Sequence, residues 1–213
     1  HLVGGAVMMA GLALHFANTG SLQLTNLSNL DDTASVLILL GILINAAAPP
    51  FGSWLPDAYP AASASGTVFL SAFTTKTAVY VLMVLFAGTK LLIWIGCGMA
   101  IYGIVYAILE NDMRRILAYS IVNQVGFMVC GIGIGTQMAL NGAAAHAVAH
   151  IIYKALLLMS AGSVLYMTGK RKCTELGGLY RTMPLTMICG TIGALAISSF
   201  PATSGFTTKS MIT

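Results

Sequence analysis

Seven stretches of apolar residues alternate with short polar segments along the chain. They cover residues 1–17, 34–50, 65–87, 91–109, 116–135, 141–168 and 183–212. Most approach the length of about 20 residues that an α-helix needs to cross the hydrocarbon core of a bilayer. The pattern therefore predicts an all-α, polytopic transmembrane helix bundle, with residues 1–213 forming a single transmembrane domain.

Composition agrees with this pattern. Hydrophobic residues make up 57% of the chain and charged residues only 8%, with a mean hydropathy of +0.87. Soluble domains carry about a quarter charged residues, so that class is excluded. The net charge of +4 lies mostly in short loops and does not indicate a nucleic-acid partner. The four cysteines have no CxxC spacing, which argues against a zinc site or a disulfide framework.

The basic residues predict the orientation of the bundle. If every stretch crosses the membrane, one side collects Arg114, Arg115, Lys170, Arg171, Lys172 and Arg181, and the other side has only Lys90. The positive-inside rule then places the loops 110–115 and 169–182 in the cytoplasm. No charged segment with a cleavage site precedes the first stretch, and we expect the chain to be an internal piece of a longer polytopic protein.

Two stretches are interrupted by proline. Pro49 and Pro50 interrupt the second, shortly after Asn45, and Pro201 interrupts the last. Proline removes a backbone donor and clashes with the preceding turn, so both helices should break there. In lipid, broken backbone is tolerated only where protein buries it or water lines it. The two stretches are expected to cross in opposite directions, which is typical of inverted repeats around an ion pathway; two ordinary proline kinks are the alternative.

Ionisable side chains lie within the apolar stretches. A charged lysine at the centre of a membrane helix costs at least about 2.5–3.5 kcal/mol, so Lys76, Lys154 and Lys209 should face a protein interior or a hydrated cavity. His146, His150 and Lys154 are four residues apart and form one stripe that rises about 12 Å along a helix. Since histidine titrates near neutrality, the stripe is predicted to pass protons, with water bridging its members.

Other interpretations of these residues stay open. The HxxxH spacing suits zinc, but the sequence has no HExxH glutamate and no evident third ligand. Two histidines on one helical turn would not hold two separate haems, and no metal or other cofactor is expected. A further interpretation of the stripe is a polar cluster between helices without a transport role. The charges of loop 110–115 either pair with one another or line a gate, and Asp57 caps a short helix or holds its loop.

Five motifs resemble one family. They are "WLPDAYP", "FLSAFTTKTAVY", "ENDMRRILAYSIVNQVGFM", "HAVAHIIYKALLLMSAG" and "LGGLYRTMP…SSFPATSGFTTKSM". In this order they resemble the antiporter-like subunits shared by respiratory complex I and the multisubunit Mrp-type cation/proton antiporters, above all the D-type subunit of Mrp antiporters. The resemblance implies two inverted repeats with broken helices and a hydrophilic axis of Lys, His and Glu. The chain then comprises the end of the first repeat and most of the second.

The resemblance also implies roles for particular residues. Lys154 matches the family's central lysine, preceded by His146 and His150, and Lys209 matches the lysine at the second broken helix. Lys76 matches a lysine that some members carry in the helix after the first break. Where many members have a lysine in the first broken helix, this sequence has Asn45, so either the first repeat is altered or Lys76 substitutes.

The function expected from these residues and the resemblance is proton translocation. The chain would act as a subunit of a cation (Na⁺)/proton antiporter or of an NADH dehydrogenase-type complex, in a bacterial plasma membrane. Its partners would be other membrane subunits, lipid and protons, with or without Na⁺. Redox chemistry would belong to partner subunits, because the sequence has no site for nicotinamide, flavin or iron–sulfur. A non-conducting assembly subunit, favoured by Asn45, is the alternative; a transporter of small organic solutes is a third, which no aromatic or acidic constellation supports.

Overall fold

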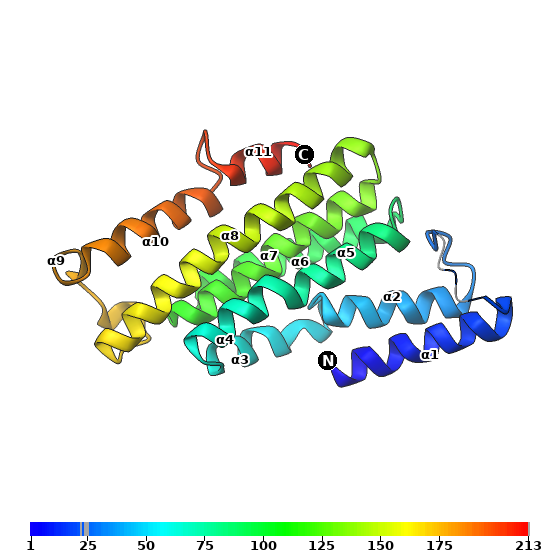
Figure 1. Cartoon of the computed structure of the whole chain (residues 1–213), viewed down its shortest axis with the longest axis horizontal. Coiled ribbons are helices and arrows are strands. Elements are labelled where there is room, and N and C mark those ends of the chain that lie inside the picture. Colours follow the sequence, from blue (N-terminus) through cyan, green and yellow to red (C-terminus); the bar gives the residue numbers. More distant parts are fainter. Residues whose placement is uncertain (22, 24–25, 213) are drawn as a thin grey trace.

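The fold is a bundle of long helices lying side by side (Figure 1). The computed structural model describes residues 1–21, 23 and 26–212, and all named elements among them are helical. Five helical segments are long and apolar enough to cross a membrane: α1 (Leu2–Thr19), α4 through α5 (Ala64–Leu85), α6 (Leu91–Leu109), α7 (Met113–Ile134) and α8 (Gln137–Thr168). Two shorter apolar helices are α2 (Thr33–Asn45) and α10 (Pro184–Ile197). The prediction of an all-α, multi-pass membrane bundle is confirmed.

Two predicted loops are wrong in part, because they are helical. Within residues 51–64, a 3₁₀ turn (Phe51–Ser53) leads into α3 (Trp54–Ala61). Pro56 lies in the first turn of α3, where backbone N–H groups have no partner within the helix, so proline is tolerated there. The loop predicted around residues 135–140 is also shorter. Thr136 Oγ1 accepts a hydrogen bond from the Ala139 N–H, and this N-cap starts α8 at Gln137.

Helix α10 is followed by a break and by α11 (Ser204–Ser210), just as α2 is followed by a break and by α3. In Figure 1, α2 and α3 run from right to left, and α10 and α11 run from left to right. The two interrupted helices therefore cross the bundle in opposite directions, as the alternation of stretches predicts.

The basic loops before α7 and after α8 meet at one end of the bundle. The Met113 N–H donates to the Arg171 carbonyl at 3.1 Å, and Arg171 Nε lies 3.4 Å from Asp112 Oδ2. Lys172 and Asp112 form an isolated β-bridge. The turn between α5 and α6, which holds Lys90, lies at the opposite end (Figure 1). The predicted separation of basic residues between the two ends is therefore present in the structure.

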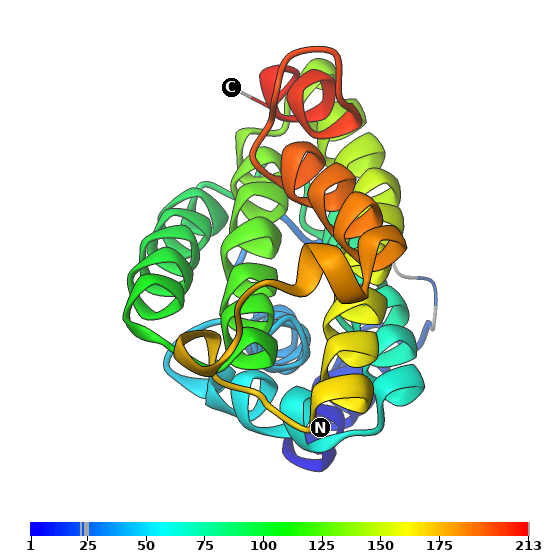
Figure 2. The same cartoon turned by 90° about the vertical axis from the view of Figure 1, so that its left-hand side faces the viewer.

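Helix α8 packs against the second broken helix and against the membrane segment that follows the first break. It packs against α7, α10 and α11, and also against α4, the π-helical turn Leu70–Thr74 and α5 (Thr75–Leu85). Viewed from the end of the bundle, α8 lies beside α10, while α6 lies on the far side of α7 (Figure 2). Side chains on several faces of α8 are consequently removed from lipid.

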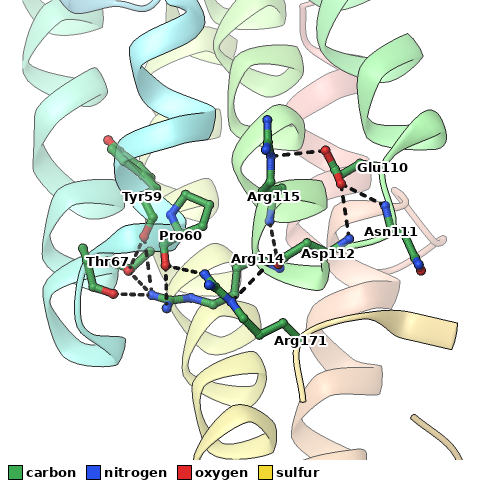
Figure 3. Close-up of polar contacts among 10 residues, drawn as sticks. Tyr59, Pro60, Thr67, Glu110, Asn111, Asp112, Arg114, Arg115 and Arg171 are labelled. Carbon is green, nitrogen blue, oxygen red and sulfur yellow. Dashed lines mark hydrogen bonds and ion pairs between the residues drawn. The ribbon is translucent and has the colours of Figure 1, made fainter. Parts of the chain in front are cut away.

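The turn between α3 and α4 is fastened to α7 by a buried arginine (Figure 3). Arg114 is only 5% exposed, and its guanidinium donates to the carbonyls of Pro60 and Ala62, both at 2.9 Å, and to the Thr67 hydroxyl. Because α3 ends at Ala61, its last carbonyls have no backbone donor within the helix. A guanidinium supplies several donors in a fixed plane and places positive charge at the negative end of the helix.

The charges of loop 110–115 were expected either to pair with one another or to line a gate, and Arg115 does pair with a carboxylate of the loop. Arg115 lies 3.2 Å from Glu110 (Figure 3). It also lies 3.4 Å from Asp57, which is exposed in the first turn of α3. Asp57 thus helps hold α3 to α7. Pairing with the loop carboxylates does not describe the Arg114 guanidinium, whose partners are backbone carbonyls and a hydroxyl.

We predict that Arg114→Met destabilises the protein more than Arg115→Met does. The Pro60 carbonyl would keep Arg171 as a donor at 2.8 Å, but the Ala62 carbonyl would lose the Arg114 donor. A buried polar group left without its partner costs about 1–3 kcal/mol, whereas a half-exposed ion pair contributes about 0–1 kcal/mol. The free energy of unfolding of the detergent-solubilised full-length subunit, titrated with denaturing detergent, measures the difference. Equal losses for the two variants would contradict the role given to Arg114.

Candidate functional site

The stripe predicted on the helix 141–168 lies on α8 and is fully enclosed. His146, His150 and Lys154 each have 0% exposed area. The rings of His146 and His150 are 6.2 Å apart between centroids, and the His150 ring is 5.2 Å from that of Tyr153. The stripe therefore places three basic groups and a phenol in one buried column.

Lys154 is hydrogen-bonded across the bundle to α7. Its Nζ donates to Ser120 Oγ at 2.7 Å. Each of the three ion pairs among the described residues involves an arginine at the end of the bundle, so no carboxylate pairs with Lys154 in this part of the chain. A charged lysine deep in a membrane bundle is costly, and here a hydroxyl is its direct partner.

Lys76 reaches the same region from α5. It is 7% exposed, and its Nζ donates to the Ser71 carbonyl at 2.8 Å and to Thr75 Oγ1 at 3.1 Å. Ser71 belongs to a π-helical turn, Leu70–Thr74, which departs from regular i→i−4 pairing. Lys76 thus donates a hydrogen bond to a carbonyl of this irregular turn. The apolar pattern of residues 65–87 does not predict the turn.

His150 lies where these basic groups converge. Lys154 lies one turn further along the same helix, and both α5, which carries Lys76, and α11, which carries Lys209, pack against α8. Both ring nitrogens are buried and have no protein hydrogen-bond partner among the described residues. Buried polar groups in proteins normally have partners, so a histidine in this state is a candidate for function.

His146 connects three helices. Its Nε2 is 3.1 Å from Gln124 Oε1 on α7, and its Nδ1 is 2.8 Å from Thr208 Oγ1 on α11. The Tyr153 hydroxyl donates to the same Gln124 oxygen at 3.4 Å. Gln124, Thr208 and Ser120 were not among the site residues predicted from sequence. Ser120 and Gln124 are polar residues four apart inside an apolar helix, a spacing that indicates a shared face.

Lys209 lies at the second break. Helix α10 ends at Ile197, and Lys209 Nζ on α11 donates to the Ile197 carbonyl at 2.9 Å. The ammonium also lies 5.5 Å from the centre of the Phe127 ring, within the range of a cation–π interaction. Pro201 lies in the non-helical segment between the two halves. Lys209 is half-buried and borders the α8 stripe from the α11 side through the neighbouring Thr208.

The first break repeats this arrangement with different side chains. Helix α2 ends at Asn45, Pro49 and Pro50 follow, and Trp54 Nε1 donates to the Ile44 carbonyl at 3.0 Å. In both breaks, a side chain from the second half thus caps a carbonyl at the end of the first half. The donor is a neutral indole at the first break and an ammonium at the second.

The backbones of the two breaks also correspond. Ala47 and Ser199 each lie two residues beyond the end of the first half, and each has a positive φ, of 62° and 60°. Gly52 and Gly205 each pack on a backbone carbonyl: an added Cβ would overlap the Ala47 oxygen within the first break and the Ala196 oxygen in the last turn of α10. Only glycine fits so close to a backbone carbonyl.

Asn45 is separate from the α8 stripe. Its Oδ1 is 2.7 Å from His1 Nδ1, and it borders a cleft of about 370 Å³ between α1, α2 and α5. Thr74 and Thr77 line the same cleft, and no residue of α8 does. The structure therefore brings Lys76 and α11, with Lys209, next to the three residues of the stripe. Asn45, Pro49 and Pro50 lie at a different site.

The comparisons with known proteins show the family. Residues 1–213 match the family described as "NADH:quinone oxidoreductase/Mrp antiporter, TM". The chain belongs to this family. The resemblance inferred from the five motifs is thereby confirmed.

Individual family members are similar over nearly the whole chain. The N subunit of NADH-quinone oxidoreductase from Desulforudis audaxviator is 34% identical over 221 residues, covering 94% of this chain and 44% of its own. The D subunit of an Na⁺/H⁺ antiporter from Alkalihalophilus pseudofirmus is 32% identical over 216 residues, covering 97% and 43%. The structure of the Mrp complex from Dietzia sp. DQ12-45-1b contains a chain that matches with a TM-score of 0.92 and 28% identity, covering 99% and 42%. The chain thus spans less than half the length of these relatives.

We predict that Gly205→Ala destabilises the second break, since the new methyl group would overlap the Ala196 carbonyl. Overpacking of this kind typically costs about 1–3 kcal/mol. Gly98→Ala is the matched control: a Cβ there meets nothing within 4 Å, and alanine favours a helix interior over glycine. The thermal midpoint Tm of the full-length subunit in detergent should fall for Gly205→Ala and stay level or rise for Gly98→Ala. A level Tm for Gly205→Ala would contradict the tight contact.

Proposed function

We propose that this chain is the proton-translocating part of an antiporter-like subunit. The observation that carries the proposal is the enclosed column of basic side chains whose hydrogen-bond partners are hydroxyls, an amide and carbonyls. Hydroxyl and water groups accept a hydrogen bond from an ammonium and donate one to an amine, so they serve both protonation states. Intramembrane groups of this kind mark ion pathways and proton relays. Family membership supports the same function.

In the proposed route, protons move stepwise along Lys76, His150 and His146, Lys154 and Lys209. Lys76 and Lys154 approach His150 from α5 and from its own helix, and Ser120 holds Lys154 from α7. The unpartnered ring nitrogens of His150 suit bridging water molecules, which buried polar sites of this kind bind. Tyr153 borders the same column.

The wider architecture follows from the same proposal. The matching backbones of the two breaks and their opposite directions support an inverted repeat, of which this chain holds the end of the first copy and most of the second. The clustered basic residues support a cytoplasmic position for the loops 110–115 and 169–182. We place the protein in a bacterial plasma membrane.

The relatives support a place in a larger assembly. Similarity to an Mrp complex chain and to subunits of an Na⁺/H⁺ antiporter and an NADH-quinone oxidoreductase suggests other membrane subunits as partners. In this proposal the chain moves protons, with or without Na⁺, and any redox step belongs to those partners.

A non-conducting assembly subunit is the second candidate. It is favoured by Asn45, which cannot titrate, and by the neutral cap that Trp54 provides at the first break. In that case the bundle would serve as a scaffold, and the buried lysines would only hold helices together.

The test replaces Lys154 by alanine in the full-length subunit within its complex. Because alanine can neither hold nor release a proton, we expect proton movement to be lost while the complex still assembles. Proton movement is followed with a pH-sensitive dye in vesicles, during respiration or after a sodium pulse. Lys170→Ala, a change in the exposed loop after α8, is the control and should transport normally.

Lys154→Arg adds a second readout, because arginine keeps the positive charge but does not release its proton. A relay predicts that this variant also fails to move protons, whereas a scaffold predicts that it works. Normal transport by Lys154→Ala would overturn the relay and favour the assembly subunit.

A further inference from the structure

Two side-chain amides of α7, those of Asn123 and Gln124, form a chain of hydrogen bonds from a backbone carbonyl of α6 to His146. Asn123 Nδ2 donates to the Ala100 carbonyl of α6 at 2.8 Å. Gln124 Nε2 donates to Asn123 Oδ1, also at 2.8 Å. Gln124 Oε1 then lies 3.1 Å from His146 Nε2. Asn123 is 9% exposed and Gln124 4%, so these groups depend on one another for hydrogen bonds.

The hydrogen bonds of these amides can run in only one donor-to-acceptor direction. A backbone carbonyl accepts and never donates, so Asn123 must turn its NH₂ group to Ala100 and its oxygen to Gln124. Gln124 must then turn its NH₂ group to Asn123 and its oxygen to His146. Since the Gln124 oxygen carries no hydrogen, His146 Nε2 has to donate. The Tyr153 hydroxyl, which donates to the same oxygen, agrees with this assignment.

We propose that Gln124, supported by Asn123, is a positioning residue that holds neutral His146 in the tautomer with hydrogen on Nε2. The nitrogen left to take up and release a proton is then Nδ1, which faces α11. This inference rests on the proposed function for its role in transport, but the tautomer itself is a property of the hydrogen bonds.

The Nδ1 side is built to accept both protonation states. Thr208 Oγ1 lies 2.8 Å from His146 Nδ1 and 2.9 Å from the Ser204 carbonyl. When His146 is neutral, the Thr208 hydroxyl donates to Nδ1. When a proton binds Nδ1, the new N–H donates to Thr208 Oγ1, and the hydroxyl hydrogen turns to the Ser204 carbonyl. One hydroxyl rotation therefore accommodates the proton: the new Nδ1–H bond forms as the bond between that proton and its donor, a hydronium ion or a neighbouring ammonium group, breaks.

This arrangement connects the charge of His146 to the second broken helix. Thr208 and Ser204 belong to α11, and Lys209 is the next residue. The basic groups on the neighbouring helices are Lys209 of α11 and Lys76 of α5, both of which pack against α8, and His150 and Tyr153 face His146 from α8 itself. On the Nε2 side the amide chain ends at a backbone carbonyl, which does not titrate. His146 therefore exchanges its proton through Nδ1 alone and does not conduct through the ring toward α6.

The experiment is ¹⁵N NMR of the full-length subunit in its complex, labelled at histidine and reconstituted in lipid. Protonated and unprotonated ring nitrogens have separate ¹⁵N shifts, and the signals that disappear in His146→Asn assign the residue. In the wild type we expect neutral His146 with hydrogen on Nε2. Gln124→Met, which removes the acceptor, should shift the tautomer ratio about threefold to tenfold toward Nδ1–H, the range expected for one hydrogen bond.

Two further variants act as controls. Gln124→Glu keeps an acceptor oxygen facing Nε2 and should keep hydrogen on that nitrogen, both in the neutral ring and in the imidazolium that a carboxylate favours. Gln137→Met changes an exposed glutamine at the start of α8 and should leave the His146 signals unchanged. Neutral wild-type His146 with hydrogen on Nδ1, or an unchanged tautomer ratio in Gln124→Met, would overturn the inference. Because this readout needs no transport, normal proton movement by Lys154→Ala would remove the proposed function and leave the tautomer assignment standing.

Discussion

Helices that end inside this bundle leave backbone carbonyls that lipid cannot hydrogen-bond, and the rest of the structure depends on how these carbonyls are paired. A side chain from another segment provides the donor in each case. Trp54 donates to the end of α2, Arg114 to the end of α3, and Lys209 to the end of α10. Each contact also ties two segments together, so the irregular backbone is held in place.

The two breaks show that similar backbones carry different chemistry. Both have a residue with positive φ and a glycine packed on a carbonyl, but the capping donor is an indole in one and an ammonium in the other. At the first break the neutral cap is accompanied by Asn45, and Lys76 lies in the next membrane segment rather than in the broken helix itself. The asymmetry between the two halves therefore resides in a few side chains, while the fold of the breaks is shared.

The hydrogen-bond partners of His146 and Lys154 on α8 come from α7 and α11. Ser120 holds Lys154, and Gln124 and Thr208 hold the two ring nitrogens of His146. These partners are neutral, so they orient the basic groups without fixing their charge. A carboxylate in the same places would stabilise the charged forms and make proton release more difficult.

Much of the fold could be predicted from the amino-acid sequence: the membrane bundle, the apolar stretches, the positions of both breaks and the stripe on α8. These features follow from local causes, namely the length of apolar runs, the missing N–H of proline and the four-residue spacing of a helix. The family was also recognisable from five motifs in order, and the match over residues 1–213 confirms it.

Which polar groups meet depends instead on tertiary packing. The segment of α3 was expected to lie in a loop between two membrane stretches, with a short helix at Asp57 left open. Its last carbonyls are paired by Arg114 from α7, more than fifty residues later in the chain. From sequence, Arg114 was one of the charges of loop 110–115, which were expected either to pair with one another or to line a gate. The partners of His146 come from two other helices, at separations that no local pattern encodes. Local sequence fixes where a helix can form or break in lipid, whereas the pairing of buried donors and acceptors is settled only when distant segments pack.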